Sequence, residues 1–274
     1  MKRNFKLPIL LLVLAMSISF LACTNNKNIN SNTNKTNPTE INKKSEEKLT
    51  VGKDFKNINK DGSFVVRADK DGKIEVVKDF TKSTSKNIKQ IEWYTDPLCP
   101  DCRRAHNATK DYLNEIIPKG EVEIKYHMLD LLHGRTENDY SLVTSAYITG
   151  IAEEFPQQIL QTIDMIYNDE CFDKFKEEKN IEKELMTYLS NHKECKYVCK
   201  DIDKYKDIVT KATKEFRENE TLKEMSFKED HSLFVPFIFD TETKIVLDGE
   251  NEDAENNVLL PIKTITGCKE EDCN

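Results

Sequence analysis

The chain has 274 residues, a formal net charge of −8 at pH 7, and 33% charged residues. Acidic residues are interleaved with the lysines, so the composition argues against a nucleic-acid-binding surface and favours a soluble domain. The sequence has only eight glycines and carries neither a nucleotide-binding fingerprint nor a phosphate loop.

The first residues have the pattern of an export signal. A positively charged start, with Lys2, Arg3 and Lys6, is followed by a mostly apolar stretch that ends at Cys23. This stretch is too short to span a membrane comfortably. Residues 20–23, Phe-Leu-Ala-Cys, resemble the lipobox of bacterial lipoproteins, in which the cysteine is lipidated. We therefore expect a signal peptide over residues 1–22 and a lipid on Cys23, with secretion without lipidation as the alternative.

The next segment has the composition of a linker. Residues 24–48 are almost entirely Asn, Lys, Thr, Ser and Glu, without an aromatic residue, so they cannot form a core. A flexible coil of this length reaches roughly 30 Å. The sequence predicts a disordered tether over residues 23–50 that holds a domain away from the membrane.

A domain over residues 51–265 follows, and its first half alternates between strands and a helix. Residues 63–67 and 73–77 flank an Asp-Gly turn and predict a hairpin. Residues 88–94 predict a third strand, residues 103–117 a helix, and residues 121–128 another strand. A strand, helix and strand of these lengths form a right-handed parallel crossover.

The sequence Cys99-Pro100-Asp101-Cys102 lies where the third strand passes into this helix. A helix that begins at the first cysteine places its sulfur beside unpaired backbone N–H groups, and the positive end of the helix dipole stabilises a thiolate. Since the thiolate is the attacking species in disulfide exchange, the pair predicts a redox-active dithiol. One alternative is half of a zinc site, completed by Cys195 and Cys199 near His192. The other is a structural disulfide, which contributes little stability across so short a loop.

The second half of the domain is mainly helical. Apolar residues at helical spacing predict a helical insertion over about residues 135–228. Residues 233–240 and 244–249 predict a second hairpin, a short helix is expected before residue 265, and residues 266–274 are expected to form a tail.

Four features together resemble the DsbA-like thiol-disulfide oxidoreductases of the thioredoxin-fold superfamily. They are the strand that ends at Trp93 and Tyr94 before the two cysteines, the strand at residues 124–127, the long helical insert, and Val235-Pro236 followed by a strand and hairpin. The resemblance covers residues 62–265 and implies an α/β thioredoxin-like fold, a central mixed sheet flanked by helices, with an inserted helical subdomain.

The same resemblance implies roles for individual residues. Cys99 would exchange with a substrate sulfur and Cys102 would resolve the mixed disulfide, while Pro100 fits an early helical position because its missing N–H is not needed there. Pro236 would be a cis-proline opposite the cysteines, and Val235 would offer main-chain groups to an extended substrate. A proline on an edge strand is the structural alternative for Pro236.

Two acidic residues are candidates for tuning the dithiol. Strong oxidants of the family tend to have His between the cysteines, whereas this chain has Asp101. A carboxylate beside Cys99 disfavours its thiolate, which predicts a weaker oxidant. Glu92 resembles an acidic residue that some members use as a proton relay, although the match requires one extra residue in the loop 95–98. The alternative is that Glu92 faces solvent.

Five cysteines are left after Cys23 and the dithiol: Cys171, Cys195, Cys199, Cys268 and Cys273. An exported chain favours disulfides. We expect Cys171 to pair with Cys195 or Cys199, because a bond between the latter two within one helix would be strained. A Cys268–Cys273 bond would close a small loop and leave one thiol unpaired.

These features together predict a lipid-anchored enzyme on the outer face of the cell membrane that exchanges disulfides with cysteines of exported proteins, without a cofactor. A membrane redox partner, either a quinone-linked oxidase or an electron-donating reductant, would decide whether the enzyme oxidises, reduces or isomerises its substrates. The contrasting hypothesis is a lipoprotein whose thioredoxin-like domain only binds a partner.

Overall fold

The computed structural model describes residues 55–59, 61–82, 88–191, 201–250 and 252–267. In chain order the elements are β1 (Phe64–Ala68), β2 (Ile74–Val77), β3 (Lys89–Thr95), α1 (Pro100–Ile116), β4 (Val122–Met128), α2 (Tyr140–Glu154), η1 (Pro156–Gln158), α3 (Ile159–Ile166), α4 (Asp169–Phe175), α5 (Ile181–Asn191), α6 (Ile202–Arg217), α7 (Glu220–Met225), β5 (Phe237–Asp240), β6 (Val246–Asp248), η2 (Glu255–Leu259) and α8 (Leu260–Ile265).

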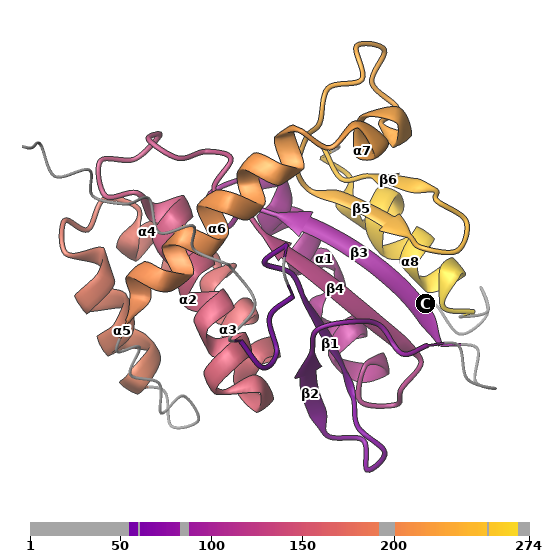
Figure 1. Cartoon of the computed structure of the whole chain (residues 1–274), viewed down its shortest axis with the longest axis horizontal. Coiled ribbons are helices and arrows are strands. Elements are labelled where there is room, and N and C mark those ends of the chain that lie inside the picture. The colour runs from indigo at the N-terminus through magenta and orange to yellow at the C-terminus, as the bar shows by residue number, and fades with distance from the viewer. Residues whose placement is uncertain (1–54, 60, 83–87, 192–200, 251, 268–274) are drawn as a thin grey trace, which may run out of the picture. The chain divides into compact units, whose positions relative to one another are not determined.

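Within the described residues, one mixed sheet of six strands has the order β2-β1-β4-β3-β5-β6 (Figure 1). The neighbours β3 and β4 run parallel and are joined by α1, which is the predicted crossover. The other neighbouring strands pair antiparallel, and both predicted hairpins are present as β1–β2 and β5–β6. The thioredoxin-like architecture implied by the resemblance is therefore confirmed.

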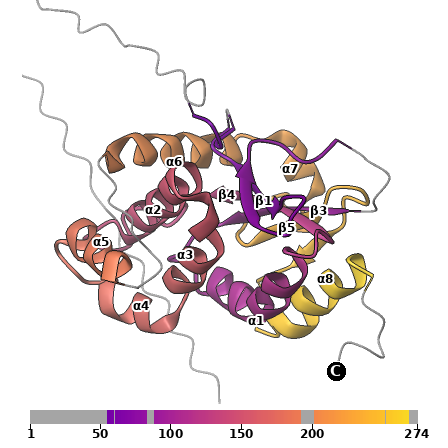
Figure 2. The same ribbon diagram turned by 90° about the horizontal axis from the view of Figure 1, so that it is seen from below.

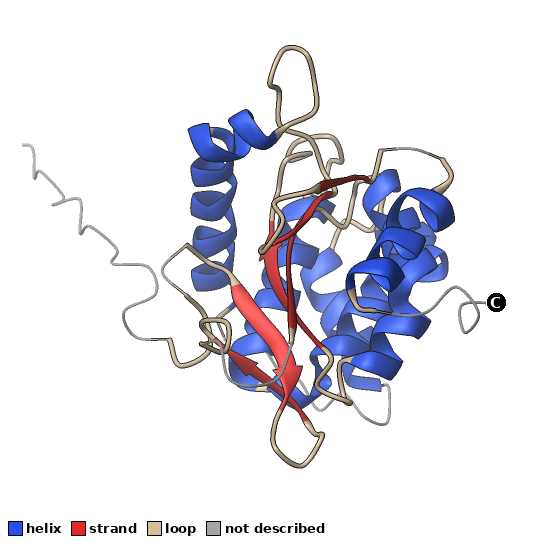
Figure 3. Cartoon of the chain, turned by 90° about the vertical axis from the view of Figure 1, so that its right-hand side faces the viewer, coloured by secondary structure: helices blue, strands red, loops and turns tan. Residues whose placement is uncertain are grey.

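Helices cover both faces of the sheet, and the central strand β3 carries large buried side chains on both faces near its end. Figure 2 shows α1 and α8 on one side of the strands and α6 on the other, and Figure 3 shows the same layering from a second direction. Trp93 of β3 lies against Tyr126, which lies against Phe64. On the opposite face Tyr94 contacts Phe216 of α6. Large side chains on both faces of β3 thus fix the strand from which the active-site loop emerges.

The helices α2 to α7 lie between β4 and β5 in the chain and fall within the predicted insertion. The residues of α2 are buried on nearly every side, as expected for a helix at the centre of a helical cluster. It packs against α6, α3 and α5. The hydroxyl of Tyr147 on α2 donates to the carbonyl of Glu182, which begins the first turn of α5.

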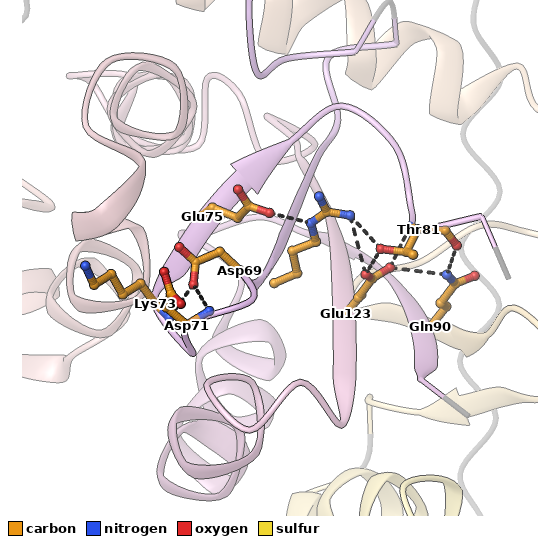
Figure 4. A network of polar contacts seen from close by, with 8 residues as sticks. Asp69, Asp71, Lys73, Glu75, Thr81, Gln90 and Glu123 are labelled. Carbon is orange, nitrogen blue, oxygen red and sulfur yellow. Dashed lines mark hydrogen bonds and ion pairs between the residues drawn. The ribbon is translucent and has the colours of Figure 1, made fainter. Parts of the chain in front are cut away.

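A buried carboxylate ties the connection after β2 to the sheet. Glu123 of β4 is 2% exposed and forms an ion pair with Arg67 of β1 at 3.7 Å. Its Oε2 also accepts hydrogen bonds from the backbone N–H of Thr81 at 2.9 Å and from the side chain of Gln90 at 3.2 Å. Figure 4 shows Thr81 and Gln90 facing Glu123 across this network. Because the charge is paired and hydrogen-bonded, its burial is compensated and the segment is held against β3 and β4.

Several predicted features lie outside the described residues. These are the signal peptide, Cys23, the tether, and the four cysteines Cys195, Cys199, Cys268 and Cys273. Among the helices that the structure describes, none combines the length and the apolar character that a membrane crossing requires.

Candidate active site

The two cysteines of the CPDC motif lie at the N-terminal end of α1. After β3 ends at Thr95, the backbone N–H of Cys99 donates to the carbonyl of Asp96 at 3.0 Å and closes a turn. Cys99 has extended backbone angles and is the N-cap residue, and Pro100 is the first helical residue. The sequence prediction that the helix starts at the first cysteine is confirmed, so the Cys99 sulfur lies at the positive end of a 17-residue helix.

The two thiols differ in exposure and in acidity. Cys99 is 7% exposed and Cys102 is fully buried, and both are free thiols. Hydrogen bonds from the side chain and the backbone N–H of Cys102, together with the charge of Arg103, lower the pKa of Cys99 against the opposing effect of burial. Burial and the contact with Cys99 raise the pKa of Cys102 well above its ordinary value. Cys99 is thus suited to be the nucleophile, while Cys102 keeps its proton at neutral pH.

The loop before β5 lies against Cys99. The Val235–Pro236 peptide bond is cis, the conformation that the resemblance implied. The Cys99 thiol donates to the carbonyl of Val235 at 3.4 Å, so the main chain at Val235 borders the reactive sulfur. Gly249, just after β6, packs on Pro236 so closely that an added Cβ would lie 2.3 Å from the Pro236 Cγ. Sequence reasoning missed Gly249, although the Asp-Gly pair at the end of the second hairpin was visible.

Asp101 forms a local ion pair with Arg104. Its carboxylate binds the guanidinium of Arg104 on the next turn of α1, and its side chain is 24% exposed. The carboxylate that raises the pKa of Cys99 in the structure is Asp96. The predicted effect of Asp101 on redox potential stays a prediction.

Glu92 of β3 is engaged in a buried polar cluster. Its Oε2 lies 3.1 Å from the Nε2 of His127 on β4 and accepts a hydrogen bond from the hydroxyl of Tyr94, also at 3.1 Å. Burial is the largest single effect and opposes ionisation of Glu92, but the hydrogen bond and charge of His127, the charge of Lys125 and the hydrogen bond from Tyr94 together lower its pKa. The side chain is only 20% exposed, so the interpretation that Glu92 faces solvent is wrong. A relay role stays a prediction, and the polar groups that Glu92 contacts are His127 and Tyr94.

The carboxyl next to the CPDC motif is instead Asp96, which sequence reasoning placed only in a turn. Asp96 is fully buried, and its Oδ1 accepts the backbone N–H of Leu98 at 2.8 Å. Its Oδ2 accepts the backbone N–H of Leu132 at 2.9 Å and the hydroxyl of Ser141 at 2.7 Å. Burial outweighs these bonds and raises the pKa of Asp96 to about 6. An acidic residue in the turn directly before the cysteines was the signal that pointed to it.

One backbone N–H group and one hydroxyl group contact the Cys102 sulfur from the end of β3. The N–H of Asp96 lies 3.5 Å from this sulfur, and the hydroxyl of Thr95 hydrogen-bonds it. Thr95 also hydrogen-bonds the hydroxyl of Tyr167, just after α3, at 2.7 Å. Since Tyr167 and Ser141 both belong to the helical insert, the insert contributes directly to the surroundings of Cys102.

The remaining thiol in the described part of the chain, Cys171, is buried and free in α4, and burial raises its pKa to about 12. Its expected partners, Cys195 and Cys199, lie outside that part, so their pairing stays a prediction. The alternative zinc site involves the same residues and His192 and lies outside it too. The described residues hold no group of three or more His, Cys, Asp or Glu side chains arranged for a metal ion.

Comparisons with known proteins agree with this architecture. The Thioredoxin_4 family model, described as thioredoxin, matches residues 83–224, which is just over half of the chain. No curated protein matches the sequence.

Similar solved structures include MdbA, a thiol-disulfide oxidoreductase from Actinomyces oris, with 14% identity and a TM-score of 0.50 over 78% of this chain and 88% of that one. MdbA from Corynebacterium diphtheriae has 18% identity and a TM-score of 0.46, covering 71% and 90% of the two chains. Reduced DsbA from Mycobacterium tuberculosis has 14% identity and a TM-score of 0.47, covering 74% and 92%. At such identities the likeness to the Actinomyces protein is one of fold. The chain therefore belongs to the thioredoxin family, with a fold like that of the Actinomyces protein and a CxxC motif at the start of α1.

Proposed function

We propose that this protein is an extracytoplasmic thiol-disulfide oxidoreductase that exchanges disulfides with the cysteines of exported proteins. The observation that carries the proposal is the arrangement of Cys99, whose pKa is lowered at a helix N-terminus, next to a buried Cys102 and to the carbonyl of Val235. A thiolate with a neighbouring resolving thiol is the chemistry that disulfide exchange requires.

The oxidised enzyme would act in two steps. A substrate thiolate attacks the Cys99 sulfur of the Cys99–Cys102 disulfide, and Cys102 leaves as a thiolate that takes up a proton. A second substrate thiolate then attacks the substrate sulfur of the mixed disulfide and releases Cys99 as a thiolate. The substrate leaves with one disulfide, and the enzyme carries two electrons as its dithiol. The lowered pKa of Cys99 makes it the better leaving group in the second step.

The substrate chain would bind along the main chain of Val235. Its carbonyl already accepts a hydrogen bond from the Cys99 thiol, so an extended peptide aligned there would bring its own sulfur to the same place. An open groove lined by Pro100, Arg103 and Arg104 of α1 and by residues 252–255 leaves room for a substrate chain beside the CPDC motif.

The export signal and the lipobox-like cysteine support a position outside the cytoplasm, with Cys23 anchored in the cell membrane. A redox partner in that membrane, a quinone-linked oxidase or an electron-donating reductant, would restore the active state. We propose net oxidation of substrates as the direction when the partner withdraws electrons, and reduction or isomerisation when it supplies them.

Trapping of mixed disulfides tests the proposal. In cells that carry Cys102→Ala, Cys99 should accumulate in disulfides with exported proteins, because the resolving thiol is missing. A Cys171→Ala variant is the matched control, since it removes a buried thiol outside the motif, and it should trap nothing. Partners that persist in a Cys99→Ser variant and resist reductant would instead support a binding module.

A further inference from the structure

We propose that Asp96 is a positioning residue that couples the helical insert to the acid–base chemistry of the CPDC motif. The inference rests on the dithiol function proposed above and goes beyond it, because it assigns control of that chemistry to a carboxyl outside the motif and to the insert.

The hydrogen bonds of Asp96 join three separate segments of the chain. Leu98 belongs to the active-site loop, Leu132 to the loop after β4, and Ser141 to the first turn of α2. The backbone N–H of the same residue faces the Cys102 sulfur. A change in the carboxyl group of Asp96 therefore acts on the loop that carries Cys99 and on the group that contacts Cys102.

The donors that hold this carboxyl group are neutral. Within the described part of the chain, the titratable groups that interact with Asp96 are Cys99 just before α1, Cys102 of α1, Asp130 after β4, Tyr140 of α2 and Tyr167 after α3, and none of these is a cation. Arg103 of α1 acts on Cys99 instead. In a buried site without a positive partner, the charged and neutral forms of a carboxyl group are close in free energy near neutral pH.

The charge of Asp96 acts against the thiolate at Cys99. The ionised carboxylate raises the pKa of Cys99, so protonation of Asp96 favours the Cys99 thiolate. The coupling is mutual, so a thiolate at Cys99 also disfavours ionisation of Asp96. Since the pKa of Asp96 is about 6, its charge changes in the pH range around that value.

The insert takes part through the hydroxyl of Ser141. This hydroxyl donates to Oδ2 of Asp96 and so favours the ionised form. Without it, Asp96 keeps its proton to higher pH, and the Cys99 thiolate forms more readily. The position of α2 relative to the sheet thereby sets how nucleophilic Cys99 is.

The test is the pH dependence of Cys99 alkylation by iodoacetamide in the reduced full-length protein, followed by mass spectrometry of the Cys99 peptide. Wild type is compared with Asp96→Asn, Ser141→Ala and the matched control Glu123→Gln, which removes a buried carboxyl from the neighbouring strand β4. We expect the Cys99 midpoint to fall by about one pH unit in Asp96→Asn, to fall less in Ser141→Ala, and to stay unchanged in Glu123→Gln.

Equal midpoints in wild type, Asp96→Asn and Ser141→Ala would overturn the proposal, and so would a shift of the same size in Glu123→Gln. If Asp96→Asn does not fold by circular dichroism, the comparison of Ser141→Ala with Glu123→Gln decides alone: a lower midpoint only in the former supports the proposal, and no difference overturns it. Alkylation needs no turnover, so this outcome is separate from a failure of Cys99 and Cys102 to form a disulfide in glutathione buffers, which would refute the dithiol function itself.

Discussion

Glu92 in β3 and Asp96 just after this strand lie four residues apart, and the pKa values of their carboxyl groups shift in opposite directions. Glu92 is 20% exposed and lies beside His127, and its pKa is lowered. Asp96 is fully buried and meets only neutral hydrogen-bond donors, and its pKa is raised to about 6. The comparison teaches that burial and the charges around a carboxyl group together decide whether it stays ionised. Of the two, the one that acts on Cys99 has its charge change near neutral pH.

The comparison of the two carboxyl groups matters for function only if Cys99 performs disulfide exchange. Removing the Cys99 sulfur should therefore have the largest effect on activity. Cys99→Ser should abolish dithiol-dependent reduction of insulin, because no nucleophile remains at the start of α1. The change should leave stability nearly unaltered, since the hydroxyl keeps the shape of the thiol. Cys171→Ala should retain activity, and activity that survives in Cys99→Ser would refute the assignment.

The two carboxyls should give stability profiles of opposite slope. A carboxyl whose pKa is raised on folding stabilises the fold below its ordinary value of 3.8, and this contribution is lost as the pH rises through about 6. Relative to Asp96→Asn, wild type should therefore lose about 2 kcal/mol of unfolding free energy between pH 4 and pH 7. Urea unfolding at a series of pH values measures it.

Glu92 should behave in the reverse sense. Its pKa is lowered on folding, so its contribution is present above its ordinary value of 4.5 and is lost as the pH falls through the lowered value. Relative to Glu92→Gln, the unfolding free energy of wild type should increase as the pH rises from the lowered pKa to the ordinary value of 4.5. If the difference in unfolding free energy between wild type and variant changed with pH in the same direction for both variants, the two carboxyl groups would not differ in the way described.

Removing the imidazole beside Glu92 should make its site resemble that of Asp96. His127→Ala takes away the ring nitrogen that lies 3.1 Å from the half-buried Glu92 carboxylate, and we expect a loss of about 2 kcal/mol in unfolding free energy at pH 7. The loss should shrink in the double variant with Glu92→Gln, because no carboxylate is then left unpaired. A double-mutant cycle by urea unfolding checks this, and purely additive losses would speak against the ion pair.

The smallest effect is expected at Asp101, which is partly exposed and paired with Arg104. Asp101→Asn should raise the reduction potential of the dithiol by only about 10 mV, since solvent and the guanidinium screen the carboxylate. A glutathione titration of both proteins measures the shift. A shift larger than that of Asp96→Asn would reverse the ranking of the buried and the exposed carboxyl.

The local features of the fold were predictable from the sequence, and the long-range ones were not. The β3–α1–β4 crossover and the start of the helix at Cys99 follow from residue periodicity and from Pro100 in the first turn. The contact between Cys99 and Val235 spans 136 positions and was implied only by the family resemblance. Asp96 went unrecognised because its role depends on donors at Leu132 and Ser141, which no local pattern places beside it.

The contacts of Glu92 were likewise not predictable from the local sequence. Strand alternation and the resemblance offered a solvent-facing side chain or a relay. The pairing of β3 with β4 instead places Glu92 within reach of His127, and this register is set by the whole sheet. Gly249 is likewise explained only by the approach of Pro236 from another loop.

The most direct test of the central claim is a redox titration of the full-length protein in glutathione buffers, with the disulfide located by mass spectrometry. The account predicts one two-electron transition in which Cys99 and Cys102 become linked to each other, and its loss in either single-cysteine variant. A titration in which these two cysteines never form a disulfide, while the protein stays folded, would contradict it.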